Sequence, residues 1–487
     1  TLQIAARNSR EYQESKEAVF HAALDLDLER DAFRSTFSGT LDSELSSDHS
    51  GAERVQGSEN SLGGSVSKTL KAGASLSGKI GIDVVKLLTG DRDSAYGISA
   101  DTSISIPLLR GAGKHIQRES LTQAERNVVY AIHALEEFKR SLAVDVAEGF
   151  LGVMRAEDAA YNAQRNYETL DSSAKRASSM AEAGRLPEIQ VDQTHQDQLR
   201  AYDRSVSAKK AVAQLMDSFK LSLGLPPDAK IALKRDAFTK LIQEAAERSK
   251  QTAAIPDESN MVVAALENRL DLKSAVGRVR DAQRAVVVAA DALRAEVPLL
   301  GSATAGGSRS LQNADQDNVQ LELSKGILSG LLSIDLPFER TAERNAFRSR
   351  LTDLERAVRN AQEKEDSIKL QIRNGLRNLA ESREGIVTQL EAVRLAERRQ
   401  RSTRLFLKAG RAEMRDLLEA EESLLSVRNA LTAAIVNYRL AELRLQRDVG
   451  VLQVTDEGLA QEASLMPIAE GRTEPSPPDQ PGVPNHD

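Results

Sequence analysis

The spacing of apolar residues along this chain predicts long helices and a small number of strands. Four stretches carry apolar residues at steps of three and four, the period of an α-helix that buries one face. They cover residues 110–183, 188–223, 339–409 and 412–449. In YGISADTSISIPLL, at 96–109, apolar and polar residues alternate instead. This alternation predicts a strand with one apolar and one polar face.

The same landmarks occur twice in the same order. The first half contains, in order, SISIPLLRGAGK, AEAGRLPEIQ and LSLGLPPD. The second half contains LSIDLPFERTAER, LKAGRAEMRD and RDVGVLQV in the same order. The matched positions, about 230 residues apart, are Pro107 and Pro337, Gly184 and Gly410, and Gly224 and Gly450. The pattern predicts a tandem duplication of a strand–long helix–turn–long helix unit, which cannot bury its own apolar surface alone.

This duplication divides the chain into four predicted segments. Residues 1–225 form the first repeat, with a helix, two strands, an extra hairpin around 65–83 and a long helical hairpin. Residues 226–260 link the repeats, and residues 261–454 form the second repeat, with a helix, two strands and another long helical hairpin. The proline-rich tail, 455–487, is expected to be disordered.

Composition narrows the function classes. Aromatic residues make up 3% of the chain and Trp is absent, which argues against several conventional cores. The formal charge of −7 does not favour nucleic-acid binding. Cysteine is absent, so there is no disulfide or thiolate metal site. No run of about eighteen apolar residues occurs, which excludes a transmembrane helix but not a membrane β-barrel, whose strands alternate.

The strands then require partners. Two main strands from each half make four in the chain, and an open sheet leaves two unpaired edges. In lipid each unsatisfied backbone group costs several kcal/mol, so an open sheet is not viable there. Three chains would supply twelve strands, which is within the range of membrane β-barrels. We therefore expect a mainly α fold with β: a trimer that is a β-barrel at one end and a tube of helices at the other.

These features, taken in order over about residues 1–454, resemble the TolC-like outer-membrane efflux proteins. The resemblance is carried by NSREYQESKEAVFHAA and ENRLDLKSAVGRVRDAQ, by SIPLLRGAGK, and by the two A-G-R turns. It implies a homotrimeric exit duct in the cell outer membrane, with a twelve-stranded β-barrel continued by a periplasmic α-helical barrel. Such a duct docks a periplasmic adaptor protein and an inner-membrane transporter, serves efflux or type I secretion, and needs neither enzymatic activity nor a cofactor.

The resemblance also implies roles for particular residues. The adaptor-docking tip turns correspond to Gly184, Arg185, Leu186, Gly410 and Arg411. Asp416 and Glu419, on the helix after the second turn, correspond to acidic rings that narrow the channel and attract cations. Pro107 and Pro337 correspond to the junctions between barrel and helices. The gate tyrosine and arginine of the family fall on Leu407 and Ala412, and the opposing aspartate falls on Gln190, so the closed state must be held by other contacts.

Several other sequence patterns give little support for a functional site. GAGKH at 111–115 lacks the glycine and the Ser or Thr that a phosphate-binding loop needs. The histidines show no metal-binding spacing, and His115, His133 and His195 are expected at solvated helix positions. Glu136, Glu137, Glu421 and Glu422 are expected to be ordinary exposed helix charges. The alternative for Asp416 and Glu419 is that they are solvated acids in a charged first turn, which the helix dipole favours. The alternative function is an elongated coiled-coil scaffold of the cell envelope with no pore.

Overall fold

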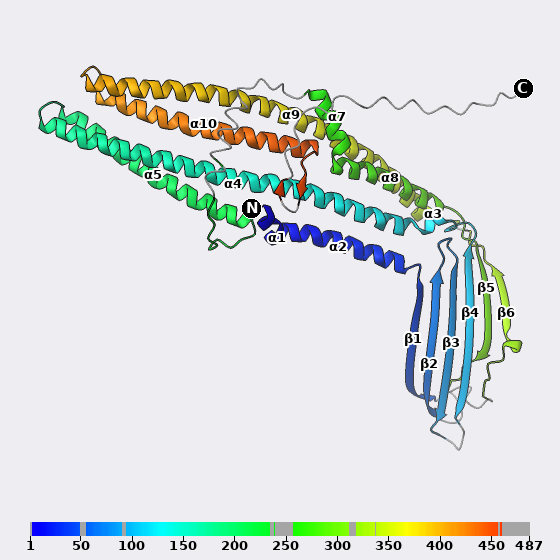
Figure 1. Cartoon of the computed structure of the whole chain (residues 1–487). Helices are drawn as coiled ribbons and strands as arrows, with labels where there is room; N and C mark the ends of the chain where they lie inside the picture. The colour runs from blue at the N-terminus through cyan, green and yellow to red at the C-terminus, as the bar shows by residue number, and fades with distance from the viewer. Residues whose placement is uncertain are drawn as a thin grey trace, which may run out of the picture. The chain divides into compact units, whose positions relative to one another are not determined.

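A computed structural model describes most of the chain as long helices and one large antiparallel sheet (Figure 1). The described residues are 2–48, 55–89, 94–233, 238, 257–310, 318–336, 338–455 and 458–459. Two compact units share them, and each unit takes residues from both halves of the chain. Unit 1 comprises residues 1–9, 139–269 and 367–487, and unit 2 comprises residues 10–138 and 270–366.

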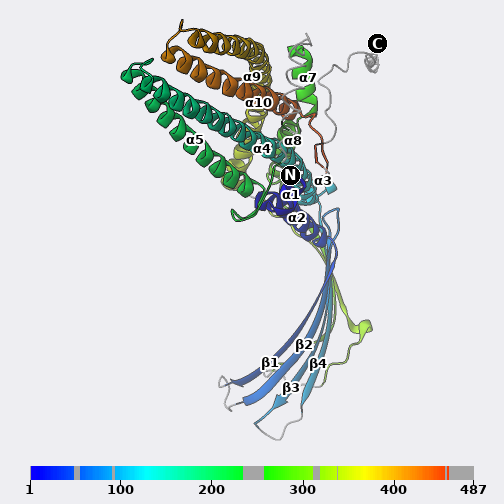
Figure 2. The ribbon, with the colours of Figure 1, turned by 60° about the vertical axis from the view of Figure 1, so that its left-hand side comes forward.

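Two long helical hairpins account for most of unit 1. The first hairpin is formed by α4 (Glu119–Glu182) and α5 (Glu188–Ser222), and the second by α9 (Thr341–Lys408) and α10 (Met414–Val449). These bounds confirm the four predicted helical stretches, except that the first long helix begins at Glu119 and not at residue 110. At 1.5 Å per residue, a helix of this kind with more than 60 residues is about 100 Å long. In both views the helices follow the order α9, α10, α4, α5 (Figures 1 and 2).

The core of unit 1 lies between these neighbouring helices. Met154 of α4 packs with Leu440 of α10, and both side chains are buried. Ile386 of α9 and Ile435 of α10 are fully buried against each other. Phe219 of α5 fills the space beside α4. The middle helices α4 and α10 are therefore covered on two sides, and α5 and α9 on one.

Shorter helices complete both units. They are α1 (Leu2–Asn8), α2 (Arg10–Asp31), α3 (Lys114–Gln117), α7 (Glu258–Asn268), α8 (Leu270–Asp291) and the 3₁₀ turn η2 (Leu323–Lys325). Among the described residues, no helix is at once long enough and apolar enough to cross a bilayer.

Six antiparallel strands in unit 2 form one sheet in sequential order. The strands are β1 (Ser35–Asp48), β2 (Val55–Thr69), β3 (Ser75–Leu87), β4 (Ala95–Pro107), β5 (Pro298–Gly307) and β6 (Ile327–Leu332). Figure 2 shows them side by side in a single curved layer. In the described part of the chain β1 and β6 are the edges, so each leaves one side of its backbone unpaired.

The expectation of a sheet with four strands per chain, with an extra hairpin around 65–83 apart from it, is wrong: among the described residues the sheet has six strands and includes that hairpin. The first half supplies β1 to β4 and the second half β5 and β6, so three chains would bring eighteen strands and not twelve. β2 and β3 form the hairpin predicted around 65–83. The miss has a physical reason: on β1 only Phe37, Leu41 and Leu45 are large and apolar, and the Ser, Gly and Thr between them weaken the alternation.

The remaining predicted segments lie partly outside the described residues. In the predicted linker, 226–260, residues 234–237 and 239–256 are not described, and α7 begins within its last three residues. In the predicted tail, Thr455 pairs with Gly458 in the short strands β7 (Val454–Thr455) and β8 (Gly458–Leu459). Residues from 460 onward are not described.

Candidate functional site: hairpin tips, carboxylates and sheet faces

Both helical hairpins turn with the same backbone geometry. Gly184 has a φ of 68°, and its N–H donates to the carbonyl of Ala181 at 2.8 Å. The N–H of Arg185 donates to the carbonyl of Met180 at 2.8 Å. Gly410, with a φ of 69°, ends α9 with the same pair of bonds. Glycine is needed at both turns because a side chain strains this left-handed conformation, which closes a Schellman cap.

The predicted docking residues differ in exposure. Arg185 and Arg411 are exposed, and among the described residues neither forms an ion pair. Leu186 is half-buried and packs on an apolar cluster that joins the two tips. This cluster includes Ala177 and Ala201 of the first hairpin and Met414, Leu417 and Leu418 of the second. The two turns are therefore held beside each other, with their arginines directed to solvent.

The structure gives Asp416 a local partner. Its carboxylate accepts the N–H of Glu413 at 3.0 Å, and the carboxylate of Glu413 accepts a backbone N–H in return. This reciprocal capping box fixes the first turn of α10. The role of Asp416 in a channel constriction depends on how several copies are arranged and stays a prediction.

Glu419 lies one turn further along α10. It forms an ion pair of 2.8 Å with Arg399 of α9, and its side chain is 64% exposed. An ion pair this exposed contributes little to stability, about 0–1 kcal/mol. The carboxylate of Glu419 therefore faces solvent beside an arginine, and its predicted role in the constriction also stays a prediction.

The structure contradicts the expected exposure of Glu421. It was expected to be an exposed helix charge, but its side chain is 9% exposed. It accepts hydrogen bonds from Gln400 and Arg404 of α9, both at 2.7 Å. The sequence held a signal for this: Met414, Leu417, Glu421 and Leu424 follow one helical stripe, so Glu421 occupies a core position. A buried carboxylate there must be paired.

At the end of β4, Pro107 leads from the sheet into helix. It lies opposite Pro298 of β5, and the chain then turns through glycines. The N–H of Gly111 donates to the carboxylate of Asp291, at the end of α8, at 2.7 Å. This bond ties the chain leaving β4 to the helix that precedes β5. Pro337, the matching predicted junction, lies outside the described residues.

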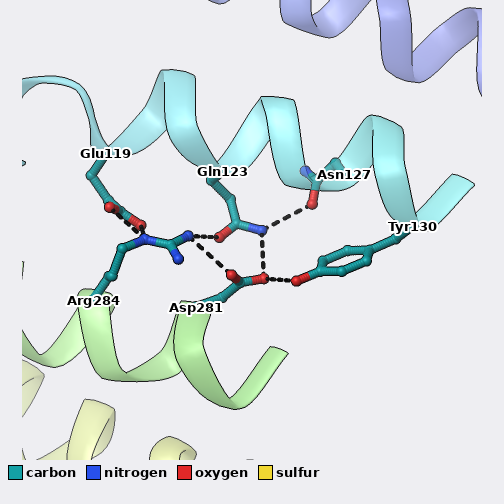
Figure 3. A network of polar contacts seen from close by, with 6 residues as sticks. All are labelled: Glu119, Gln123, Asn127, Tyr130, Asp281 and Arg284. Atoms are coloured by element: carbon teal, nitrogen blue, oxygen red, sulfur yellow. Dashed lines mark hydrogen bonds and ion pairs between the residues drawn. The ribbon is translucent and has the colours of Figure 1, made fainter. Parts of the chain in front are cut away.

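A network of polar side chains joins α4 to α8 within unit 2 (Figure 3). The carboxylate of Asp281 accepts from Tyr130 Oη at 2.6 Å and from Arg284 at 3.0 Å. Arg284 also donates to both carboxylate oxygens of Glu119 at 2.9 Å. Burial, together with the hydrogen bond to Asp281, raises the pKa of Tyr130 to about 12. Gln123 bridges the two ends of the network, which sequence reasoning missed.

His133 also differs from its expectation. It was expected at a solvated position, but it is half-buried, and one ring nitrogen lies 2.9 Å from the hydroxyl of Ser274. Burial, aided by the charge of Lys273, lowers the pKa of His133. His115 and His195 are exposed, as predicted. No cluster of metal-binding side chains occurs in the described part of the chain.

The sheet has two chemically different faces. On one face, cross-strand neighbours form a hydroxyl row that crosses all six strands. The row consists of Thr36, Ser67, Ser77, Ser103, Ser302 and Ser329. Within it, the hydroxyls of β3 and β4 are 2.7 Å apart, as are those of β5 and β6. The opposite face carries exposed apolar side chains on neighbouring strands, among them Phe37, Leu62 and Ile80.

Comparison with known proteins identifies the fold. No family model and no curated protein matches the chain. Among solved structures, the outer-membrane channel OprN superposes with a TM-score of 0.67 at 14% identity, over 92% of this chain and 88% of that one. The CmeC outer membrane channel of Campylobacter jejuni gives 0.66 at 12% identity, over 95% and 86%. The outer membrane protein VceC of Vibrio cholerae gives 0.66 at 13% identity, over 92% and 95%.

The chain therefore has the fold of the TolC-like outer-membrane channels. The predicted fold class, mainly α with β, is confirmed. At this level of identity the likeness concerns the fold, and the roles of individual residues do not follow from it.

Proposed function

We propose that this chain is the outer-membrane exit duct of a tripartite efflux or type I secretion system. In this proposal three copies form a passive conduit through the outer membrane and into the periplasm. The conduit has no enzymatic activity of its own, and an inner-membrane transporter supplies the energy. A periplasmic adaptor protein joins the duct to that transporter.

The observation that carries the proposal is the two-faced sheet with unpaired edges. The face with Phe37, Leu41 and Leu45 exposes these side chains by 77 to 78%. An exposed apolar surface of this extent suits lipid, while the hydroxyl row suits water. Backbone groups along β1 and β6 need partners in lipid. Further copies of the same chain offer them, because β6 of one copy can pair with β1 of the next.

The edge helices of unit 1 support the same assembly. On α5 an exposed stripe at steps of three and four contains Ile189, Asp192, Gln196, Leu199, Asp203 and Val206. We call this the α5 stripe. Apolar side chains and two aspartates share this stripe. In the described part of the chain neither aspartate has an ion-pair partner. Such a stripe is what a helix presents to a neighbouring helix.

The outer face of α9 is complementary to it. Leu395, Arg398, Ser402 and Leu405 form an exposed stripe at the same spacing, which we call the α9 stripe. Arg398 makes no ion pair with another described residue. Since α5 and α9 are the outermost helices of the row, α5 of one copy can pack on α9 of the next. Leucines would then meet apolar side chains, and Arg398 would meet the aspartates.

Docking of the adaptor is assigned to the two tip turns. Gly184, Arg185 and Leu186 on the first hairpin and Gly410 and Arg411 on the second lie at neighbouring tips. Neither arginine forms an ion pair with another described residue, so both could bind carboxylates of the adaptor. Asp416 and Glu419 would line the narrow opening near these tips. Each copy would add two carboxylates, which attract cations.

The alternative is a coiled-coil scaffold without a pore. It explains the long helices. It offers no reason for a sheet in which each of the six strands places a hydroxyl residue on one face.

Conductance in planar bilayers tests the proposal. Detergent-extracted protein should insert and conduct. Combining Asp416→Ala with Glu419→Ala should weaken cation selectivity. As a control for the charge change, Glu182→Ala with Glu188→Ala removes two carboxylates near the first turn and should leave selectivity nearly unchanged. Protein that never conducts, and that stays a monomer in detergent, would establish the scaffold instead.

A further inference from the structure

We infer that each chain contributes six strands to the wall of the duct, so that three chains enclose a pore of eighteen strands, wide enough for bulky hydrated solutes. This inference rests on the proposed function, and it departs from the twelve strands that the resemblance implied. The inference depends on whether β1 and β2 are part of the closed sheet that forms the wall or lie outside it.

The register places β1 and β2 in the wall. β1 pairs with β2 without interruption from Ser35 opposite Lys68 to Asp48 opposite Val55. β2 pairs with β3 in the same way from Gly57 opposite Leu87 to Thr69 opposite Ser75. A hairpin that folded away from the sheet would break this ladder at a bulge or a bend.

The side chains agree with the register. The hydroxyl row continues through Thr36 of β1 and Ser67 of β2 at the same level as on the other four strands. On the opposite face, Phe37 lies beside Val66, and Leu41 beside Leu62. β1 and β2 therefore have the same apolar and polar faces as their neighbours, which a hairpin outside the membrane would not need.

The pore size follows from strand geometry. Strands lie about 4.8 Å apart and tilt by about 40° in a closed sheet. Eighteen strands then give a cylinder about 35 Å across between backbones, and twelve give about 24 Å. An even number of eighteen is within the range of closed membrane sheets, and sheets of 16 to 18 strands leave an aqueous channel. The small hydroxyl residues of the row leave most of that width open.

The first test asks which strand meets β6 of the neighbouring copy. The protein has no native cysteine, so introduced cysteines report without background. Ser329→Cys on β6 is combined in turn with Thr36→Cys, Thr40→Cys or Glu44→Cys along the polar face of β1. Within one chain, β1 and β6 are separated by four strands, so a disulfide can form only between copies.

We expect at least one β1 variant to give disulfide-linked dimers and trimers on denaturing gels. The matched control combines Ser329→Cys with Ser77→Cys on β3, the strand that would meet β6 if β1 and β2 lay outside the wall. Cross-linking through β3 and not through β1 would overturn the inference and leave the proposed duct intact. Cross-linking through neither strand would overturn both.

The second test measures width. Poly(ethylene glycol) of graded size is added on the strand side of single conducting trimers. Polymers about 20 Å across should enter and lower the conductance. A variant lacking residues 51–90 keeps β1 antiparallel to β4, supplies four strands per chain, and should exclude these polymers. A wild-type trimer that conducts but excludes them contradicts the inference alone, while a protein that does not conduct contradicts the proposed function.

Discussion

The two helical hairpins are built on one plan, but their returning helices have different surroundings. α10 buries fourteen residues, including Leu440 and Ile435, whereas α5 buries four. The difference arises from position in the row, since α10 lies between α9 and α4 and α5 lies at an edge. Helices at matching places in the two hairpins therefore have different neighbours: α10 is buried by its own chain, whereas in the proposed trimer α5 would be covered by another copy.

The contacts inside the hairpins differ in chemistry as well. In the second hairpin α9 and α10 are joined by charged pairs: Arg399 with Glu419, Arg404 with Glu421, and Arg428 with Glu397. In the first hairpin α4 and α5 are joined by hydrogen bonds in each of which one partner is a glutamine amide. These bonds link Gln198 with Asp171, and Gln164 with Ser205 and Lys209. The second hairpin is therefore held together by ion pairs within the chain, whereas the aspartates of the α5 stripe have no ion-pair partner among the described residues.

Charge reversal on the α5 stripe should have the largest effect. Asp192→Arg and Asp203→Arg would each bring a like charge toward the α9 stripe of the next copy, at a cost on the order of 3 kcal/mol per contact. We expect each variant to lower the fraction of trimer in detergent by about tenfold or more. Native mass spectrometry measures that fraction.

A compensating charge reversal on α9 tests whether the effect is specific to the contact between α5 and α9. Arg398→Asp should restore assembly when combined with the aspartate reversal that it faces. Glu182→Arg reverses an exposed charge outside the α5 stripe and should leave the trimer intact. If the single reversals assemble as well as wild type, α5 and α9 do not meet between copies.

The next largest effect should come from removing one polar contact from each hairpin, because the loss of stability should differ between the two. Glu421→Ala deletes the buried acceptor of Gln400 and Arg404 and should cost about 1–3 kcal/mol. Ser205→Ala removes a neutral hydrogen bond of 2.9 Å to Gln164 and should cost about 1 kcal/mol or less. Melting followed by circular dichroism at 222 nm compares the two. Equal shifts would show that the charged links do not distinguish the second hairpin.

The tips are where the hairpins should behave alike. Gly184→Ala and Gly410→Ala introduce a side chain at nearly the same positive φ, and in both cases the new carbon meets nothing within 4 Å. Each change should therefore cost only the conformational strain, about 1–2 kcal/mol. Two unequal melting shifts would mean that one turn has a contact that the other lacks.

The smallest effect concerns the other end of α4. Tyr130→Phe removes one of the hydrogen bonds to Asp281 and should cost about 1 kcal/mol. Because the pKa of Tyr130 is raised above its ordinary value of 10.0, its contribution is complete below pH 10 and is lost as the pH rises through about 12. Denaturation at graded pH should show this loss in wild type only. The same loss in the variant would assign it to another group.

Much of the fold could be predicted because long periodic stretches and matched glycines are local signals. The helix ends at Gly184 and Gly410 were predictable, since only a left-handed residue closes that cap. The count of strands was not, because the Ser and Gly of β1 and β2 contribute little hydrophobicity and reveal their alternation only beside neighbours. For Glu421 the helical stripe placed the residue in the core, but its partner Arg404 comes from another helix, which no local pattern specifies.

The most direct measurement is the mass of the protein extracted from membranes in mild detergent and kept intact in the gas phase. If the edges β1 and β6 and the edge helices α5 and α9 are completed by further copies, the mass should be three times that of one chain. It should fall to one chain only together with loss of conductance. A stable single chain that retains its sheet and both hairpins would contradict the account.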